Sequence, residues 1–325
     1  MFTYVRNRLL LAIPTLLAVS FITFFLGYLS PGSPIDIMLG QHSDPVRVKQ
    51  LEHEYGLDRP PLVQYGSFVW GAVTRGDLGR SFGTGQRPVT QIIAEQFPNT
   101  AFLACMALLT AVAFGIPAGV LAALKHNRLL DRGTMGFVLL MVSMPAFVVG
   151  PLLMLLLSVR LGWLPSSGWE GEEVSLLGFK LIIPYWQYLL MPMVVLAARP
   201  AALLARFMRS SMLETIRQDY VRTAQAKGLS PGRVLFKHAF RNAFLPVLTV
   251  LGNTFGFLLT GSFVIENIFT IPGIGYQSVQ SINSRDYPVI QGVALLVAAI
   301  FITVNLVVDI LYGVLDPRVR YEGAK

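Results

Sequence analysis

Residues 206–246 read RFMRSSMLETIRQDYVRTAQAKGLSPGRVLFKHAFRNAFLP and form the longest strongly charged interval between two apolar runs of this chain. The interval contains eight Lys or Arg residues and only two acids, which gives it a net charge of +6. Such a charge is typical of any basic loop on the cytoplasmic side of a membrane protein. The residues at its centre predict a more definite structure.

The centre of this interval predicts two short helices separated by a sharp turn. Gly228 is placed to end the first helix in the left-handed conformation, which a residue without a Cβ adopts at little steric cost. Ser230 is expected to cap the second helix, and Pro231 fits its first turn. Leu229 can then pack against Val234 across the helix start. The sequence therefore predicts a rigid helix–turn–helix rather than a flexible linker.

The composition of the whole chain is that of a membrane protein. Of its 325 residues, 54% are hydrophobic and 14% are charged, against about a quarter charged in a soluble domain. Six runs are long enough to cross a hydrocarbon layer of about 30 Å as helices of about 20 residues. They cover 9–29, 100–124, 135–159, 181–198, 244–265 and 289–308. We therefore predict an all-α polytopic membrane protein with six transmembrane helices.

The Lys and Arg residues are concentrated in every second segment between the apolar runs. Lys and Arg number 2, 3, 8 and 3 in the N-terminus, 125–134, 206–243 and the C-terminal tail. The alternating segments 30–99, 160–180 and 266–288 each carry a net charge of −1. The positive-inside rule then puts both termini and the basic interval in the cytoplasm. The overall charge of +8 therefore indicates membrane topology and not a nucleic-acid partner.

The first external segment predicts two helices of its own. Asp44 and Pro45 open a short amphipathic helix that runs to about Tyr55, where Gly56 stops it. A second helix over 62–73 is rich in aromatic residues, which suits a helix at the membrane interface. A small soluble cap between the spans is the alternative for this stretch.

The sequence contains neither a catalytic nor a metal-binding motif. Without the phosphate-binding pattern GxxxxGK[ST], the chain is not expected to hydrolyse ATP by itself. Its four histidines are scattered, and Cys105 is its only cysteine. Because Cys105 falls inside the second apolar run, it is expected to be a small core residue.

The basic interval resembles the cytoplasmic EAA loop of the permeases of binding-protein-dependent ABC importers, in its dipeptide/oligopeptide form. The similarity lies in DYVRTAQAKGLS and RVLFKHAFRNAFLPV. Residues 222–224, Arg-Thr-Ala, occupy the Glu-Ala-Ala position, and Gly228 is the motif glycine. The chain departs from the general pattern at 238–241, where His-Ala-Phe-Arg replaces an apolar residue, a leucine and a proline. Further stretches that resemble peptide permeases cover 30–34, 56–65, 76–82, 272–275 and 285–288.

The resemblance implies a type I ABC-importer transmembrane fold and a permease that moves di- or oligopeptides, or related small solutes, by alternating access. It implies a second homologous permease, two ATPase subunits that use ATP and Mg, and an extracytoplasmic substrate-binding protein. No cofactor is expected on this chain. The expected location is the cytoplasmic membrane of a bacterium or archaeon. The residues expected to dock an ATPase are Arg222, Thr223, Ala224, Lys227, Gly228, Leu229, Ser230 and Arg233.

The same resemblance divides the chain into four parts. Residues 1–29 are expected to be an N-terminal transmembrane helix that acts as a signal anchor, and 30–98 an external scaffold segment. Residues 99–314 are expected to form the transmembrane domain, with 206–246 as its cytoplasmic coupling loop. The tail, 315–325, is expected to be cytoplasmic.

The path of the substrate is less well marked in the sequence. Polar residues within the spans are candidates to line it, although each one could equally serve in helix packing; they are Ser143, Asn253, Thr254, Thr260 and Ser262. Arg199, Glu266 and Asp309 lie in or near spans. We expect them to be paired or to reach the interface at span ends, rather than to contact substrate.

Two other classes of membrane protein fit the sequence less well than an importer. A secondary transporter driven by an ion gradient would usually show inverted repeats and broken helices. No repeat relates the halves of this chain, which has only six apolar runs. A membrane-embedded hydrolase would need a grouped set of catalytic residues, which the sequence does not offer.

Overall fold

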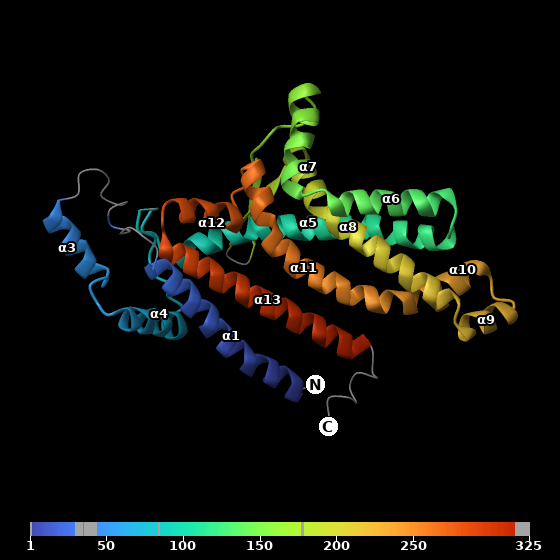
Figure 1. The fold of residues 1–325 in the computed structure, drawn as a ribbon, viewed down its shortest axis with the longest axis horizontal. Coiled ribbons are helices and arrows are strands. Elements are labelled where there is room, and N and C mark those ends of the chain that lie inside the picture. The colour runs from blue at the N-terminus through green and yellow to red at the C-terminus, as the bar shows by residue number, and fades with distance from the viewer. Residues whose placement is uncertain (1, 30–34, 36–43, 84, 177–178, 316–325) are drawn as a thin grey trace.

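The computed structural model describes residues 2–29, 35, 44–83, 85–176 and 179–315, and the structural statements below concern these residues. The stretch 30–34 and all but the first residue of the tail 315–325 fall outside them. Long helices dominate the architecture (Figure 1), as predicted from the composition.

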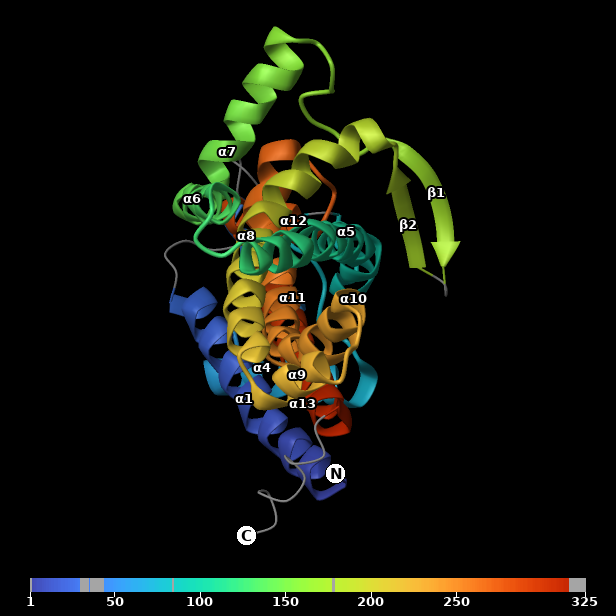
Figure 2. The same cartoon turned by 90° about the vertical axis from the view of Figure 1, so that its right-hand side faces the viewer.

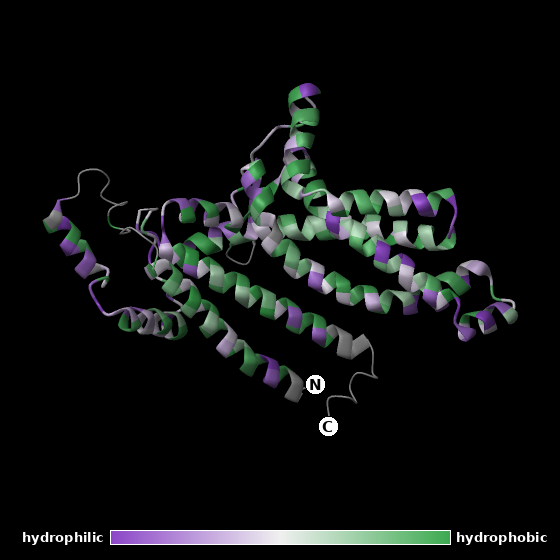
Figure 3. Cartoon of the chain, viewed as in Figure 1, coloured by the Kyte–Doolittle hydropathy of each residue, from purple (hydrophilic) through white to green (hydrophobic). Residues whose placement is uncertain are grey.

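Five helical segments are long and apolar enough to cross a membrane, or six if a bent pair counts as one span. They lie in α1 (Phe2–Leu29), α5 (Val89–Leu124), α8 (Trp186–Ile216), the continuous stretch that leads into α11 (Arg241–Phe269), and α13 (Tyr287–Leu315). Apolar residues predominate along these helices (Figure 3). The chain is a multi-pass helical membrane protein.

The third predicted span is not one straight helix. Helix α6 (Leu129–Ser143) is followed by α7 (Ala146–Leu153) and the π-helix η1 (Met154–Arg160), and the two parts are bent by 100° (Figure 1). Met144 precedes Pro145 and has extended backbone angles, because the proline ring disfavours the helical conformation of the residue before it. The loop expected at 125–134 is correspondingly short, since α6 already begins at Leu129.

The predicted start of the fourth span is also wrong. Strand β1 (Gly171–Leu176) pairs antiparallel with β2 (Phe179–Pro184) in a hairpin that projects from the helices (Figure 2). The run Leu-Ile-Ile at 181–183 therefore belongs to a strand. Its β-branched residues are favourable in strands, and helix α8 begins only at Trp186, after Pro184.

Helices α5 and α8 form the centre of the structure and approach each other closely. Gly115 and Gly119 of α5 face Ala201 and Ala205 of α8. An ideal Cβ on Gly115 would lie 2.5 Å from the carbonyl oxygen of Ala201, and one on Gly119 would overlap that of Ala205. Small residues four apart are the usual means by which membrane helices bring their backbones together.

The lone cysteine does not belong to this core. Cys105 is exposed, although Leu103, Ala104 and Ala107 of the same helix are fully buried. The expectation of a core position is therefore wrong. Every side of a membrane helix is apolar, so composition does not distinguish the packed side from the exposed one.

The two helices predicted between the first and second apolar runs are both present. Asp44 caps α3 (Pro45–Glu54) by accepting a hydrogen bond from the Val46 amide at 3.0 Å, and Gly56 follows with a positive φ of 66°. Helix α4 (Pro61–Arg75) exposes Trp70 and contacts α1 through the Tyr65 hydroxyl, which lies 2.9 Å from that of Ser20.

A buried carboxylate joins this segment to the last span. Asp286, which is 1% exposed, accepts hydrogen bonds from the Phe82 amide at 3.0 Å, the Gly83 amide at 3.2 Å and the Ser81 hydroxyl. Ser81, Phe82 and Asp286 belong to the stretches 76–82 and 285–288, which share a resemblance to peptide permeases, and Gly83 directly follows the first of them. Their similarity therefore corresponds to one contact across the fold.

The first and last long helices lie side by side. Arg8 of α1 forms an ion pair with Asp309 of α13 at 2.9 Å, as expected for a charged residue near the end of a span. The start of α1, the end of α8 and the end of α13 all point in the same direction (Figure 1). The described ends of the chain and the basic interval therefore lie toward one end of the molecule (Figure 1), and their cytoplasmic location stays a prediction.

Candidate functional site

The basic interval does not consist of two short helices between two spans, as the sequence predicted. Helix α8 runs on through its first part to Ile216, and only α9 (Asp219–Ala226) is a short separate helix. The second helix begins with α10 (Pro231–Arg233) and the π-helix η2 (Val234–Phe240), then continues directly into α11. The expectation of a short second helix is wrong, because Pro246 is accommodated inside α11 instead of ending it.

The turn itself has the predicted backbone. Gly228 has a φ of 76°, in the left-handed region, and its amide donates to the Gln225 carbonyl at 2.9 Å. Pro231 is the first residue of α10. Ser230 stands at the cap position, but its side chain makes no capping hydrogen bond. Its backbone carbonyl accepts the Val234 amide at 3.0 Å, so the backbone alone starts this helix.

A small apolar core fixes α9 against the second helix. Val221 and Ala224 of α9 are buried together with Val234, and Leu229 packs on them from the turn. The predicted contact between Leu229 and Val234 is therefore present. Side chains from both helices share one cluster, so α9 is packed against the helical stretch that leads into α11.

The outer surface of this unit is basic. Arg222 keeps 70% of its side chain exposed, and its closest ion pair, with Asp219, is long at 3.9 Å. Among the predicted docking residues, the exposed ones are Arg222, Thr223, Lys227, Gly228, Ser230 and Arg233. Ala224 and Leu229 lie beneath them, so they support the surface and do not form it.

Two aromatic residues extend this surface and were not predicted. Phe236 is 66% exposed, and Tyr220 is 42% exposed with its hydroxyl 2.9 Å from Asn242 Nδ2. Exposed aromatic side chains next to basic ones are typical of a protein-binding surface. The only hint in the sequence was their place in a charged interval.

An ion pair braces the end of α8 near this surface. Asp131 of α6 is 3% exposed and accepts two hydrogen bonds from Arg209, at 2.6 and 2.8 Å. The Asn127 amide donates to the same carboxylate at 2.9 Å, and His126 Nδ1 lies 3.1 Å from Arg209. A bidentate pair of this kind fixes direction as well as distance. The 125–134 region thus positions α8.

The five candidate path residues do not converge on one place. Thr254 and Ser262 of α11 are buried, and their hydroxyls bond the carbonyls of Val250 and Leu259. Those two hydroxyls are satisfied within their own helix, as in helix packing. The other three are Ser143, at the end of α6, and Asn253 and Thr260, on α11; Ser143 and Asn253 are exposed and Thr260 is partly buried.

Glu266 does not reach the interface, contrary to expectation. It is fully buried, and its Oε2 accepts the amides of Gly275 at 2.7 Å and Tyr276 at 3.1 Å. These are the second and third amides of α12 (Ile274–Asn283), the short helix before α13. A carboxylate at a helix start satisfies free amides there. Glu266 therefore has a structural role, as expected, but it serves as a buried cap of α12.

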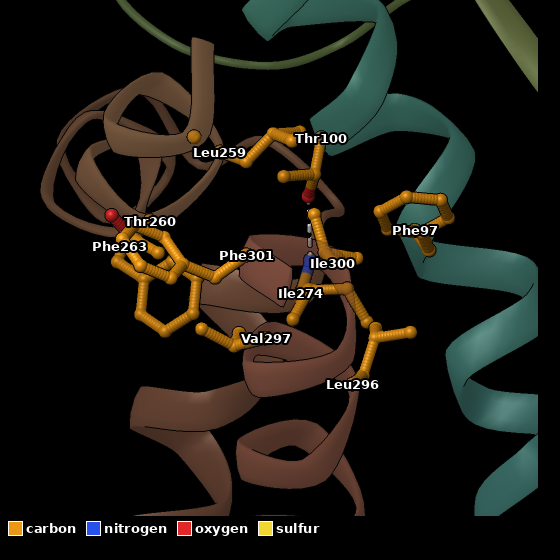
Figure 4. Close-up of a pocket in the computed structure, with 11 residues that line it drawn as sticks. Phe97, Thr100, Leu259, Thr260, Phe263, Ile274, Leu296, Val297, Ile300 and Phe301 are labelled. Carbon is orange, nitrogen blue, oxygen red and sulfur yellow. Dashed lines mark hydrogen bonds between the residues drawn. The ribbon is translucent and has the colours of Figure 1, made fainter. Parts of the chain in front are cut away.

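Beside this cap lies a small apolar pocket between α5, α11, α12 and α13. Aliphatic and aromatic side chains converge on it, and the Thr100 hydroxyl accepts the Ile274 amide at 2.9 Å (Figure 4). Its lining offers little to a polar peptide. No cluster of metal-binding side chains occurs among the residues that the structure describes.

Two family models match the chain. The model described as "Binding-protein-dependent transport system inner membrane component" matches residues 115–321, and the corresponding N-terminal model matches residues 1–104. Together they cover nearly the whole chain.

Curated relatives are similar over their full length. The chain is 44% identical to "Di/tripeptide transport system permease protein DppB" of Pseudomonas aeruginosa, over 99% of this chain and 100% of the relative. It is 41% identical to "Glutathione transport system permease protein GsiC" of Escherichia coli, with the same two coverages.

Solved structures have the same fold. The MetNI methionine ABC transporter matches with a TM-score of 0.52 at 16% identity, over 67% of this chain and 93% of that one. An amino acid ABC transporter matches with a TM-score of 0.50 at 18% identity, over 70% and 94%. The shared fold is that of type I ABC-importer permeases.

Proposed function

Because this chain belongs to the family of inner-membrane components of binding-protein-dependent transport systems, we propose that it carries di- or oligopeptides across the cytoplasmic membrane of a bacterium or archaeon. The chain is an ABC-importer permease, and permeases of this family have no ATPase site of their own. The observation that carries the peptide assignment is 44% identity over the full length of a di/tripeptide permease.

Glutathione is the second candidate substrate. A glutathione permease is 41% identical to this chain over the same length. Glutathione is itself a small peptide with a free carboxylate, so one path would suit both. Uptake assays with the two substrates decide between them.

The family assembles with ATPase and substrate-binding partners. We propose that one related permease and two ATPases complete the membrane complex, with ATP and Mg bound by the ATPases. The exposed basic surface of α9 and its turn is the proposed docking site for one ATPase. Its support is the core of Val221, Ala224 and Val234, which connects that surface to α11. The proposed division of the chain is unchanged: an anchor at 1–29, an external scaffold at 30–98, a transmembrane domain at 99–314 and a tail at 315–325.

The source of energy tests this function. In proteoliposomes that contain the complete complex and its binding protein, we expect labelled dipeptide to accumulate only with ATP inside. Replacing the phosphate-loop lysine of the ATPases should abolish accumulation, because this chain has no such loop. The measurement is the initial rate of uptake, and the purified permease alone serves as the control for hydrolysis. Uptake driven by an ion gradient without the ATPases would contradict the proposal.

The proposed topology is tested by cysteine labelling. In a Cys105→Ser background, Ser175→Cys on the hairpin should react with an impermeant maleimide added to intact cells. Ser230→Cys should react only after the membrane is opened, because the positive-inside rule places it in the cytoplasm. Both serines are exposed, so access is set by the membrane and not by the fold. Equal labelling of both positions in intact cells would reject this orientation.

A further inference from the structure

Helix α11 has one exposed side. Two other sides are covered: Leu258 and Ile265 are buried in the central core, while Gly252 and Gly256 face Val308 and Phe301 of α13. Beyond Arg241 at its start, the exposed residues that the structure describes on α11 are separated by four or seven positions, which places them on one face of the helix. They are Asn242, Pro246, Asn253, Phe257 and Val264.

Arg199 of α8 borders this exposed face. Its guanidinium carbon lies 5.7 Å from the centre of the Phe257 ring, within the range of a cation–π contact. Arg199 is exposed, on the side of α8 away from the contact of Ala201 and Ala205 with α5. Asn253 is one turn from Phe257, so its amide lies on the same face.

Arg199 is deep within its helix. Since α8 begins at Trp186, Arg199 lies about 20 Å along it at 1.5 Å per residue. Arg199 therefore lies within α8 and not at either end of it. Such a depth falls within a hydrocarbon layer of about 30 Å, where a charge facing lipid is unfavourable.

Arg199 lacks an acidic partner among the described residues, whereas three other arginines near helix ends or buried contacts have one. Arg8 pairs with Asp309, Arg87 with Glu95 and Arg209 with Asp131. Within the described part of the chain, no carboxylate lies in ion-pair range of Arg199. An arginine at this depth without an internal acid faces water, a partner subunit or a ligand.

We propose that Arg199, Phe257 and Asn253 form a subsite that binds the carboxylate of the substrate on its way through the membrane. This inference rests on the proposed transport of peptides, every one of which carries a terminal carboxylate unless it is blocked. The planar guanidinium donates two parallel hydrogen bonds to a carboxylate. The Phe257 ring holds the guanidinium in place from one side, and the Asn253 amide offers the carboxylate another donor. The remaining peptide meets mainly apolar and neutral groups, which suits variable side chains.

The test compares one dipeptide with its C-terminal amide in proteoliposomes that contain the complete complex. Each peptide is supplied bound to the substrate-binding protein at a saturating concentration. The affinity of the binding protein for each peptide is measured separately, so that its own preference can be separated from that of the permease. For Arg199→Gln, we expect the uptake rate of the free carboxylate to fall about tenfold, the usual effect of losing one charged hydrogen-bonded contact. The uptake rate of the amide should stay within about twofold of its wild-type value. The preference of the wild-type complex for the free carboxylate over the amide should therefore disappear.

Two further variants complete the design. Arg199→Lys should keep part of the preference for the free carboxylate, since lysine retains the charge but cannot donate two parallel hydrogen bonds. Arg160→Gln, at another exposed arginine, should leave both rates unchanged. An equal fall for both peptides with Arg199→Gln would overturn the subsite and indicate an ion pair with a partner subunit, and unchanged rates would also overturn it. If the wild-type complex transports neither peptide, the proposed function itself fails.

Discussion

Replacing Gly119 by alanine is expected to destabilise the assembled permease, although alanine is the better helix former. The new Cβ would overlap the carbonyl oxygen of Ala205 and lie 2.8 Å from the Met208 Cβ. Neither atom can move without displacing α8, so the two central helices must separate. Overpacking of a tight interior typically costs about 1–3 kcal/mol, and Gly119→Leu should prevent the contact altogether. Thermal unfolding of the purified protein measures the loss as a lower Tm.

Gly136→Ala is the matched control for this substitution. Gly136 lies inside α6, and a Cβ there would have no neighbour within 4 Å. Alanine should stabilise that helix slightly, by up to about 1 kcal/mol. If Gly119→Ala unfolds at the wild-type temperature or above it, the close approach of α5 and α8 is not a feature of the native protein.

Gly228→Val is expected to abolish peptide uptake while leaving membrane insertion normal. A Cβ at Gly228 would meet no atom within 4 Å, so the effect comes from the backbone conformation and not from a clash. At a φ of 76°, a side chain costs about 1–2 kcal/mol, and a β-branched one more. The turn should relax and rotate α9 relative to α11. Uptake and ATP hydrolysis by the reconstituted complex should then be uncoupled, or the ATPases lost during purification.

Gly232→Val provides the control four residues away. Gly232 is also exposed with no neighbour within 4 Å, but it lies in α10 and its φ is not positive. Uptake should therefore stay close to the wild-type rate, and Gly228→Ala should be milder than Gly228→Val. Normal uptake by Gly228→Val at normal expression would remove α9 from its proposed role in coupling.

Local chemistry made much of this fold predictable. The left-handed turn at Gly228 and the cap at Asp44 each depend on a few consecutive residues, and both occur where expected. Hydrophobic length identified most spans for a similar reason, because a membrane helix satisfies its own backbone. The resemblance then provided the fold that connects these parts.

The features that were missed depend on contacts distant in sequence. The burial of Glu266 requires α12 to present its amides, and the depth of Arg199 requires the hairpin to take up residues that looked like the start of a span. The 100° bend at Met144 and Pro145 is a special case. Proline is tolerated inside α8 and α11, so its presence alone does not tell a kink from a break. The exposed side of α11, and with it Asn253, could be identified only after its neighbours were placed.

The contact between Ser81 and Asp286 has a consequence for how the protein is made. The two residues are 205 positions apart, so a ribosome that adds about 5–20 residues per second needs on the order of ten seconds or more between them. During that time the loop around Ser81 has no Asp286 carboxylate to bind, and helix α1 has no α13 to pack against. This part of the fold is therefore completed only after the last long helix has been made. We expect a nascent chain that stalls before residue 286 to leave the residues around Ser81 more accessible to proteolysis than they are in the finished protein.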